Sequence, residues 1–188
     1  MNKFLKISIL ASILSVSGIW YFSQSKDSHR YDANASVEER FSYLSQNGNS
    51  SCSPIFKENI SNRPDDEMIM GSCCSPMSMH RYSEQVDGLK KYKDISKIPA
   101  DPYAVNPSLA KELISYYDLE LTPEEQKAYD YAMENSSEKG PCCCKCWRWY
   151  VYGGLAKYLI KNHGFTGEQI TEVWNLSDGC GGDSEHQH

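Results

Sequence analysis

Strong helix-start signals recur along this chain and limit the folds that it can adopt. Three segments match the capping box, in which a Ser or Thr is followed three residues later by Glu or Gln. They lie at residues 36–39, 122–125 and 166–169. Asn106-Pro107 and Ser75-Pro76 each combine a favoured N-cap residue with proline at the first helical position. Strand-like patterns are nearly absent, so we predict an all-α fold, a compact bundle of about five helices.

The longest predicted helix runs from about Cys144 to His163 and stops at Gly164. Gly153-Gly154 interrupts it, which lowers helix stability unless another element packs closely at that point. The helix predicted after Ser75-Pro76 is expected to bury Tyr82, Val86 and Leu89. Residues 47–64 are rich in Ser, Asn and Pro, so we predict a loop there, with Cys52 inside it and remote from any site.

The beginning of the chain is typical of an exported protein. A basic start, with Lys3 and Lys6, precedes an uncharged apolar run that ends in Trp20-Tyr21-Phe22. Aromatic residues at the outer end and the lack of a small-x-small cleavage pattern favour a membrane anchor over a cleaved signal peptide. We therefore predict a signal or anchor helix over residues 1–23, contacting the membrane through residues 4–22. A polar stalk over 24–34 and a single helical domain over 35–188 would follow on the periplasmic or cell-surface side.

Composition narrows the class of function. The net charge is −6 and the pI is about 5.4, which argues against nucleic acid as a partner. Eight cysteines in an exported chain are consistent with a disulfide framework. Their clustering argues against it, because thiols a few residues apart cannot close long loops by pairing with one another.

The first cluster of soft ligands lies between Met68 and His80. It holds Cys73 and Cys74, the thioethers of Met77 and Met79, and the imidazole of His80. Thiolate and thioether ligands favour Cu(I), whereas zinc sites use Cys, His and carboxylate. The alternative is that the methionines fill the core and that Cys73 and Cys74 form disulfides elsewhere.

The second cluster comprises Cys142, Cys143, Cys144 and Cys146. If the helix begins here, its N-terminus and the nearby Lys145 and Arg148 stabilise thiolates on one side of it. Cys180, flanked by glycines, can fold back to supply a fifth thiol as ligand or disulfide partner. These five cysteines are therefore predicted metal ligands, with disulfides to Cys52, Cys73 and Cys74 as the alternative.

Residues 128–146 resemble the exported bacterial proteins that carry a PCYCGC motif. Pro141, Cys142, Cys144 and Cys146 occupy the proline and cysteine positions of that motif, while Cys143 replaces its tyrosine and Lys145 its glycine. The resemblance covers about a quarter of the chain. It implies an exported, metal-binding bacterial protein.

Together these patterns predict an exported protein that binds a soft metal ion, first of all copper(I), for sequestration, delivery or sensing rather than catalysis. Its partners would be the metal ion, the membrane, and an exported metalloprotein or transporter. Two alternatives stay open. One is a thiol–disulfide oxidoreductase that uses Cys143 and Cys146, and the other is a disulfide-stapled module that binds a protein partner.

Overall fold

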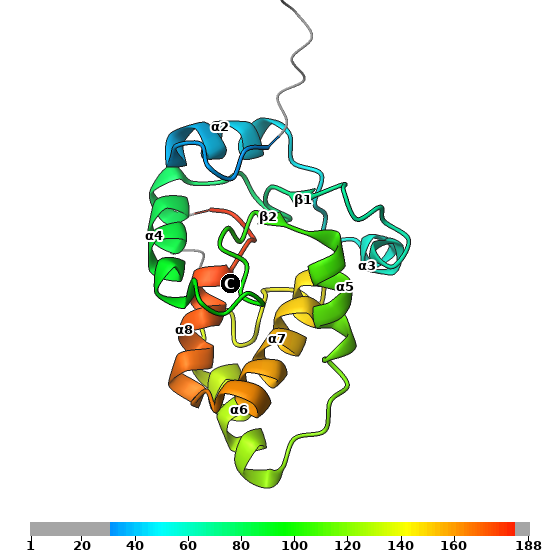
Figure 1. The fold of residues 1–188 in the computed structure, drawn as a ribbon, viewed down its shortest axis with the longest axis vertical. Coiled ribbons are helices and arrows are strands. Elements are labelled where there is room, and N and C mark those ends of the chain that lie inside the picture. Colours follow the sequence, from blue (N-terminus) through cyan, green and yellow to red (C-terminus); the bar gives the residue numbers. More distant parts are fainter. Residues whose placement is uncertain (1–30, 183–188) are drawn as a thin grey trace, which may run out of the picture. The chain divides into compact units, whose positions relative to one another are not determined.

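The computed structural model describes residues 31–182, and these residues are mostly helical (Figure 1). The described part contains seven α-helices, one 3₁₀ helix and a two-stranded antiparallel sheet. The all-α fold class is therefore confirmed. The predicted anchor at residues 4–22 and most of the stalk lie outside the described residues. Within residues 31–182, no helix combines the length and apolarity that crossing a bilayer requires.

The elements follow one another along the chain as short, separately capped helices. The α-helices are α2 (Val37–Gln46), α3 (Pro54–Ile60), α4 (Met79–Leu89), α5 (Pro107–Ser115), α6 (Pro123–Asn135), α7 (Trp147–His163) and α8 (Gly167–Ser177). The 3₁₀ helix is Lys90–Tyr92, and strand β1 (Ile69–Met70) pairs with β2 (Ala104–Val105).

The capping signals act as the sequence predicts. Ser36, Thr122 and Thr166 each accept a hydrogen bond from the backbone amide three residues on, and all three capping boxes are complete. Asn106 caps α5 by accepting from the amides of Ser108 and Leu109. Gly164 ends α7 in the left-handed conformation with φ of 64°.

Three element boundaries differ from the prediction. Helix α3 forms inside the stretch predicted to be a loop, and its first residue is Pro54. Helix α4 begins at Met79 rather than after Ser75, because the backbone of Ser75 and Pro76 is hydrogen-bonded to residues 180–182 instead. Helix α7 begins at Trp147 rather than at about Cys144. The four clustered cysteines therefore precede the helix in a loop, and Cys146 is its N-cap residue.

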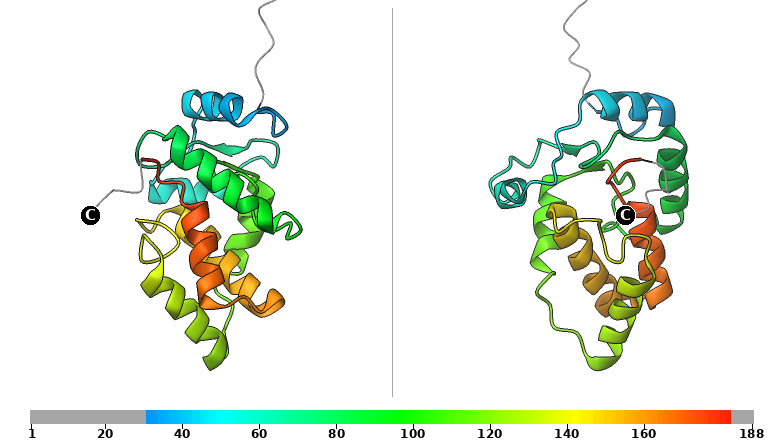
Figure 2. Two further views of the ribbon diagram at one scale, coloured as in Figure 1. Left: turned by 90° about the vertical axis from the view of Figure 1, so that its left-hand side faces the viewer. Right: turned by 180° about the vertical axis from the view of Figure 1, so that it is seen from behind.

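Helix α7 lies at the centre of the core and packs against α5, α6 and α8 (Figure 2). Trp147, Val151 and Leu155 on this helix are fully buried. The approach of α5 is very close, since a Cβ on Gly154 would lie 1.9 Å from the backbone oxygen of Leu113. The glycine pair that interrupts α7 is thus explained by a neighbouring helix, as the sequence required. This packing fixes the start of α7, where the cysteines gather.

Candidate metal centre

All eight cysteines of the chain meet at one place, and each is a free thiol. Four segments that are distant in sequence supply them. Cys52 comes from the loop before α3, and Cys73 and Cys74 follow β1. Cys142, Cys143, Cys144 and Cys146 form the loop before α7, and Cys180 follows α8. The two clusters seen in the sequence are therefore parts of a single site.

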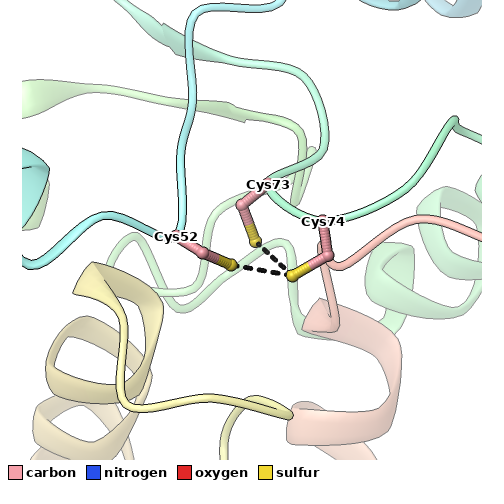
Figure 3. A group of neighbouring side chains, drawn as sticks. All are labelled: Cys52, Cys73 and Cys74. Atoms are coloured by element: carbon pink, nitrogen blue, oxygen red, sulfur yellow. Dashed lines mark hydrogen bonds between the residues drawn. The ribbon is translucent and has the colours of Figure 1, made fainter.

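The sulfur atoms form a continuous network across these segments. Cys52 Sγ lies 2.7 Å from Cys74 Sγ and 3.1 Å from Cys144 Sγ. Figure 3 shows the thiols of Cys52 and Cys73 both directed at Cys74, and the Cys73–Cys74 sulfur separation is 3.8 Å. A disulfide bond is about 2.0 Å long, so the thiols are close without being bonded.

The network continues through the loop before α7 and reaches the segment after α8. Cys74 Sγ lies 3.7 Å from Cys143 Sγ, which is 2.9 Å from Cys180 Sγ. Cys142 Sγ lies 3.3 Å from Cys180 Sγ and 3.5 Å from Cys146 Sγ. The prediction that the glycine-flanked Cys180 folds back onto the quartet matches this arrangement.

Five groups of three thiols are compact enough to hold a metal ion, because the sulfurs of each group lie within 4.8 Å of one another. The groups are Cys52–Cys73–Cys74, Cys52–Cys144–Cys146, Cys73–Cys142–Cys146, Cys74–Cys143–Cys180 and Cys142–Cys143–Cys144. Every cysteine belongs to at least one group. The cluster therefore has the geometry to hold a metal ion, and all the ligands that these groups offer are sulfur atoms.

Backbone hydrogen bonds hold the segment after α8 against the segment after β1. The amides of Cys73 and Ser75 donate to the carbonyls of Gly179 and Cys180, at 3.1 and 2.9 Å. The amide of Gly182 donates to the Pro76 carbonyl at 2.8 Å. Gly181 has a φ of +83°, and a Cβ there would lie 2.1 Å from the Ser75 oxygen. Glycine is thus required for Cys180 to reach the site.

The loop that carries Cys52 is fixed at the start of α7. The indole nitrogen of Trp147 donates to the Ser50 hydroxyl at 3.0 Å, and the Ser50 amide donates to the Met70 carbonyl at 3.0 Å. The prediction that Cys52 lies remote from the site was therefore wrong. The sequence around Cys52 has no periodicity that would predict its place. The loop is positioned by the contact between Ser50 and Trp147, which the sequence does not reveal.

Exposure to solvent divides the cluster into a buried side and an outer side. Cys142 and Cys146 are 1% exposed and Cys180 is 6% exposed. Cys52, Cys73, Cys143 and Cys144 are half-buried, and Cys74 is exposed. Cys74 is therefore the thiol of the cluster most open to solvent.

The thiols also perturb one another's protonation. Hydrogen bonds from Cys142, then from Cys146 and Cys180, hold the pKa of Cys73 far below its usual range. A hydrogen bond from Cys142 is likewise the main cause that lowers the pKa of Cys143 to about 5. Burial raises the pKa of Cys52. Two thiolates are thus stabilised by neighbouring thiols, and thiolate is the metal-binding form.

One cation lies buried beside the cluster. Arg148 is 1% exposed, and a Cβ on Gly179 would lie 2.1 Å from its guanidinium carbon. Its guanidinium donates to the carbonyls of Pro102, at 2.6 Å, and Gly71, at 3.2 Å, while its Nε is buried without a hydrogen-bond partner in the described structure. Burial acts to lower the pKa of Arg148. The negative charge of Cys73, together with that of other neighbours, has the larger effect and raises this pKa.

Three of the predicted metal ligands are not cysteines: His80, Met77 and Met79. His80 is exposed, and its Nε2 lies 3.2 Å from a carboxylate oxygen of Glu84. It belongs to none of the five groups. The Met77 thioether accepts a hydrogen bond from the Ser45 hydroxyl, at 3.9 Å, in a pocket that Ser72 and Pro76 also line. Met79 is the half-buried first residue of α4.

No protein-family model, curated protein or solved structure significantly matches this chain. The resemblance of residues 128–146 to PCYCGC proteins therefore stays a prediction. We infer the function from the geometry and chemistry of the eight thiols.

Proposed function

We propose that this protein binds a soft metal ion through its eight cysteines, with Cu(I) as the preferred metal. The observation that carries the proposal is the convergence of thiols from four segments into groups of three. No carboxylate or imidazole of the described residues joins any of these groups. An all-sulfur ligand set selects thiophilic ions and excludes Mg²⁺ and Ca²⁺ as cognate metals.

The size of the groups favours Cu(I) over zinc. Structural zinc sites are almost always tetrahedral and use four protein ligands. The compact groups found between residues 31 and 182 have three members each. A soft ion that accepts three thiolates fits this arrangement better than one that demands four.

We further propose that the site serves sequestration, delivery or sensing of the metal outside the cytoplasm. The support is the basic and apolar N-terminal sequence, which favours export and anchoring through residues 4–22. The acceptor or donor of the ion would be an exported metalloprotein or a transporter. N-terminal sequencing of native protein checks the anchor, since a mature chain that begins near Ser23 or later contradicts it.

Metal analysis of full-length protein purified without oxygen tests the binding function. We expect bound copper when Cu(I) is supplied, thiols protected from alkylation while it is bound, and eight titratable thiols after the metal is stripped. Competition with Zn²⁺ at equal concentration should leave copper bound. Protein that takes up neither ion, with all its thiols free, would contradict the proposal.

The low pKa of Cys143, about 5, favours thiol–disulfide exchange as the second candidate function. Cys143 Sγ lies 2.9 Å from Cys180 Sγ, so the exchanging pair would be Cys143 and Cys180 rather than Cys143 and Cys146. Turnover of a disulfide substrate by metal-free protein would support this candidate. Purified protein with its thiols paired and no turnover would instead support the disulfide-stapled module.

A further inference from the structure

We infer that the eight thiols bind several Cu(I) ions in one thiolate-bridged cluster rather than a single ion. The inference rests on the proposed function and specifies the form in which the metal is held. It is carried by the way in which the three-thiol groups share their members, by the absence of a four-thiol group among residues 31–182, and by the charge of the site.

Sharing of thiols is nearly complete. Seven of the eight cysteines belong to two groups each, and Cys180 belongs to one. Cys73, for example, joins Cys52 and Cys74 in one group and Cys142 and Cys146 in another. An ion in each of two such groups would share a sulfur ligand, which is the arrangement of a bridging thiolate. Independent mononuclear sites would instead use separate sets of cysteines.

A single ion does not account for the cluster. A thiolate–metal bond is about 2.3 Å long, so three thiolates around one ion lie roughly 4.0 Å apart. The network fits this spacing locally, but it runs from Cys52 through Cys74 and Cys143 to Cys180 and Cys142 by successive steps of 2.7 to 3.7 Å. One ion reaches three of these sulfurs, and the others remain close, partly buried and unused.

Charge balance points the same way. Each thiol that binds loses one proton to solvent, and each Cu(I) brings one positive charge. One ion held by three thiolates would leave a net charge of about −2 in a site where Cys142, Cys146 and Cys180 are buried. Arg148 offsets part of it, while Lys145 is exposed to solvent. When neighbouring ions share thiolates, each further ion needs fewer new thiolates, so the negative charge for each bound ion falls and binding of the first ions favours the next.

The group count bounds the number of ions. Five groups set an upper limit of five, and eight thiols divided into groups of three that share nothing would hold two. Bridging by several thiolates moves the expected number towards the upper limit. We expect three to five Cu(I) ions per chain, on the order of one ion per three-thiol group.

Anaerobic titration of the full-length chain with Cu(I) tests the inference, followed by native mass spectrometry and X-ray absorption. We expect metal-free and fully loaded chains to dominate the spectra at intermediate copper, and a copper–copper distance to be resolved in the absorption data. One ion per chain, or several ions without a copper neighbour, would overturn the bridged cluster while leaving the proposed function intact. A chain that binds no copper would instead refute the proposed function.

Two variants on opposite sides of the cluster sharpen the test. Cys74→Ser lies on the exposed side and Cys142→Ser on the buried side, and no group contains both residues. In a bridged cluster both changes lower the number of ions and weaken the copper–copper signal. Cys74→Ser should fold because the residue is exposed, and circular dichroism checks this. A folded Cys74→Ser protein with an unchanged ion count and copper–copper signal would overturn the inference.

Discussion

Arg148 brings a positive charge into the interior beside the thiols. Its guanidinium carbon lies 4.6 Å from the centroid of the Trp147 ring, and its donors reach the carbonyls of Pro102 and Gly71. Replacing it in an Arg148→Met variant leaves two buried carbonyls without these donors and the thiolates without the cation. We expect the free energy of unfolding of metal-free protein to fall by roughly 3–5 kcal/mol, measured by urea denaturation.

Lys145→Met is the matched control for Arg148→Met. Lys145 lies in the same cysteine loop and carries the same charge, but its side chain is exposed. Exposed charges contribute little to stability, so the free energy of unfolding of this variant should lie within roughly 0.5 kcal/mol of the wild-type value. Equal losses from both variants would show that charge near the loop matters and that burial of Arg148 does not.

His80 and the nearby methionines offer a second test at the residue scale. The exposed imidazole of His80 faces Glu84, and the Met77 thioether accepts from Ser45. We therefore expect His80→Ala, and the double change Met77→Leu with Met79→Leu, to leave the number of bound Cu(I) ions unchanged. Leucine keeps the size and apolarity of methionine, so folding should survive. Metal analysis checks this, and a lower copper count would return these residues to the ligand set.

The sequence identified most thiol ligands but not how they are combined. Clustering marked Cys73, Cys74 and the quartet before α7, and the flanking glycines marked Cys180. Cys52 carries no such mark, since it stands alone in a polar stretch. Its place beside Cys74 and Cys144 depends on the contact between Trp147 and Ser50, which joins residues far apart in the chain.

At the level of helices, the packing of α5 on α7 depends on Gly154. A Cβ at this position would lie 1.9 Å from the backbone oxygen of Leu113, and a backbone atom cannot move aside without shifting α5. We expect Gly154→Ala to lower the free energy of unfolding by about 3 kcal/mol or more.

Gly153→Ala is the matched control. A Cβ at Gly153 would lie 2.9 Å from the Tyr117 ring, and this side chain can move aside. Gly153→Ala should therefore cost about 1 kcal/mol or less, because alanine also favours the helix. Thermal unfolding of both variants measures the difference, and equal losses would contradict the role of α5.

The segment after α8 gives a prediction that links backbone conformation to metal binding. Gly181 has a positive φ and packs against the Ser75 carbonyl, so a Gly181→Ala change is strained and displaces the segment that carries Cys180. We expect fewer bound Cu(I) ions and faster alkylation of Cys180 in the metal-free variant. Quantitative mass spectrometry of the alkylated protein measures this. Ser177→Ala is the control, because it lies before this segment and changes no glycine. Its Cys180 should be alkylated at the wild-type rate.

Helix starts were predictable where the cap is local and not where distant residues compete. Thr122 and Thr166 cap their helices through hydrogen bonds that span three residues. Ser75-Pro76 has the same local pattern, but its backbone pairs with residues 180–182, and α4 starts later. The start of α7 was predicted too early: Cys146 is its N-cap residue, and Cys142, Cys143 and Cys144 lie in the loop before it.

For the molecule as a whole, metal binding and stability should be coupled. The thiols come from four segments, so an ion bound by them cross-links the loops before α3 and α7 with the segments after β1 and α8. A ligand that binds the folded state alone stabilises it by about 4 kcal/mol at a thousand times its dissociation constant. We expect removal of copper by a chelator to lower the melting temperature, and hydrogen exchange to rise in these four segments first. An unchanged melting temperature would contradict this coupling, because it would show that copper does not bind the folded chain more tightly than the unfolded chain.

The order in which the four segments appear in the chain constrains when the site can work. Cys52 is synthesised first and Cys180 last, with α4 to α8 between them. A chain that crosses a membrane unfolded, as the N-terminal sequence suggests for this one, therefore carries scattered thiols rather than a formed site. The cluster is completed after residue 180 has emerged and α8 has docked. Under the proposed export and metal binding, the metal ion would be acquired in the compartment of arrival, because the site does not exist before translocation.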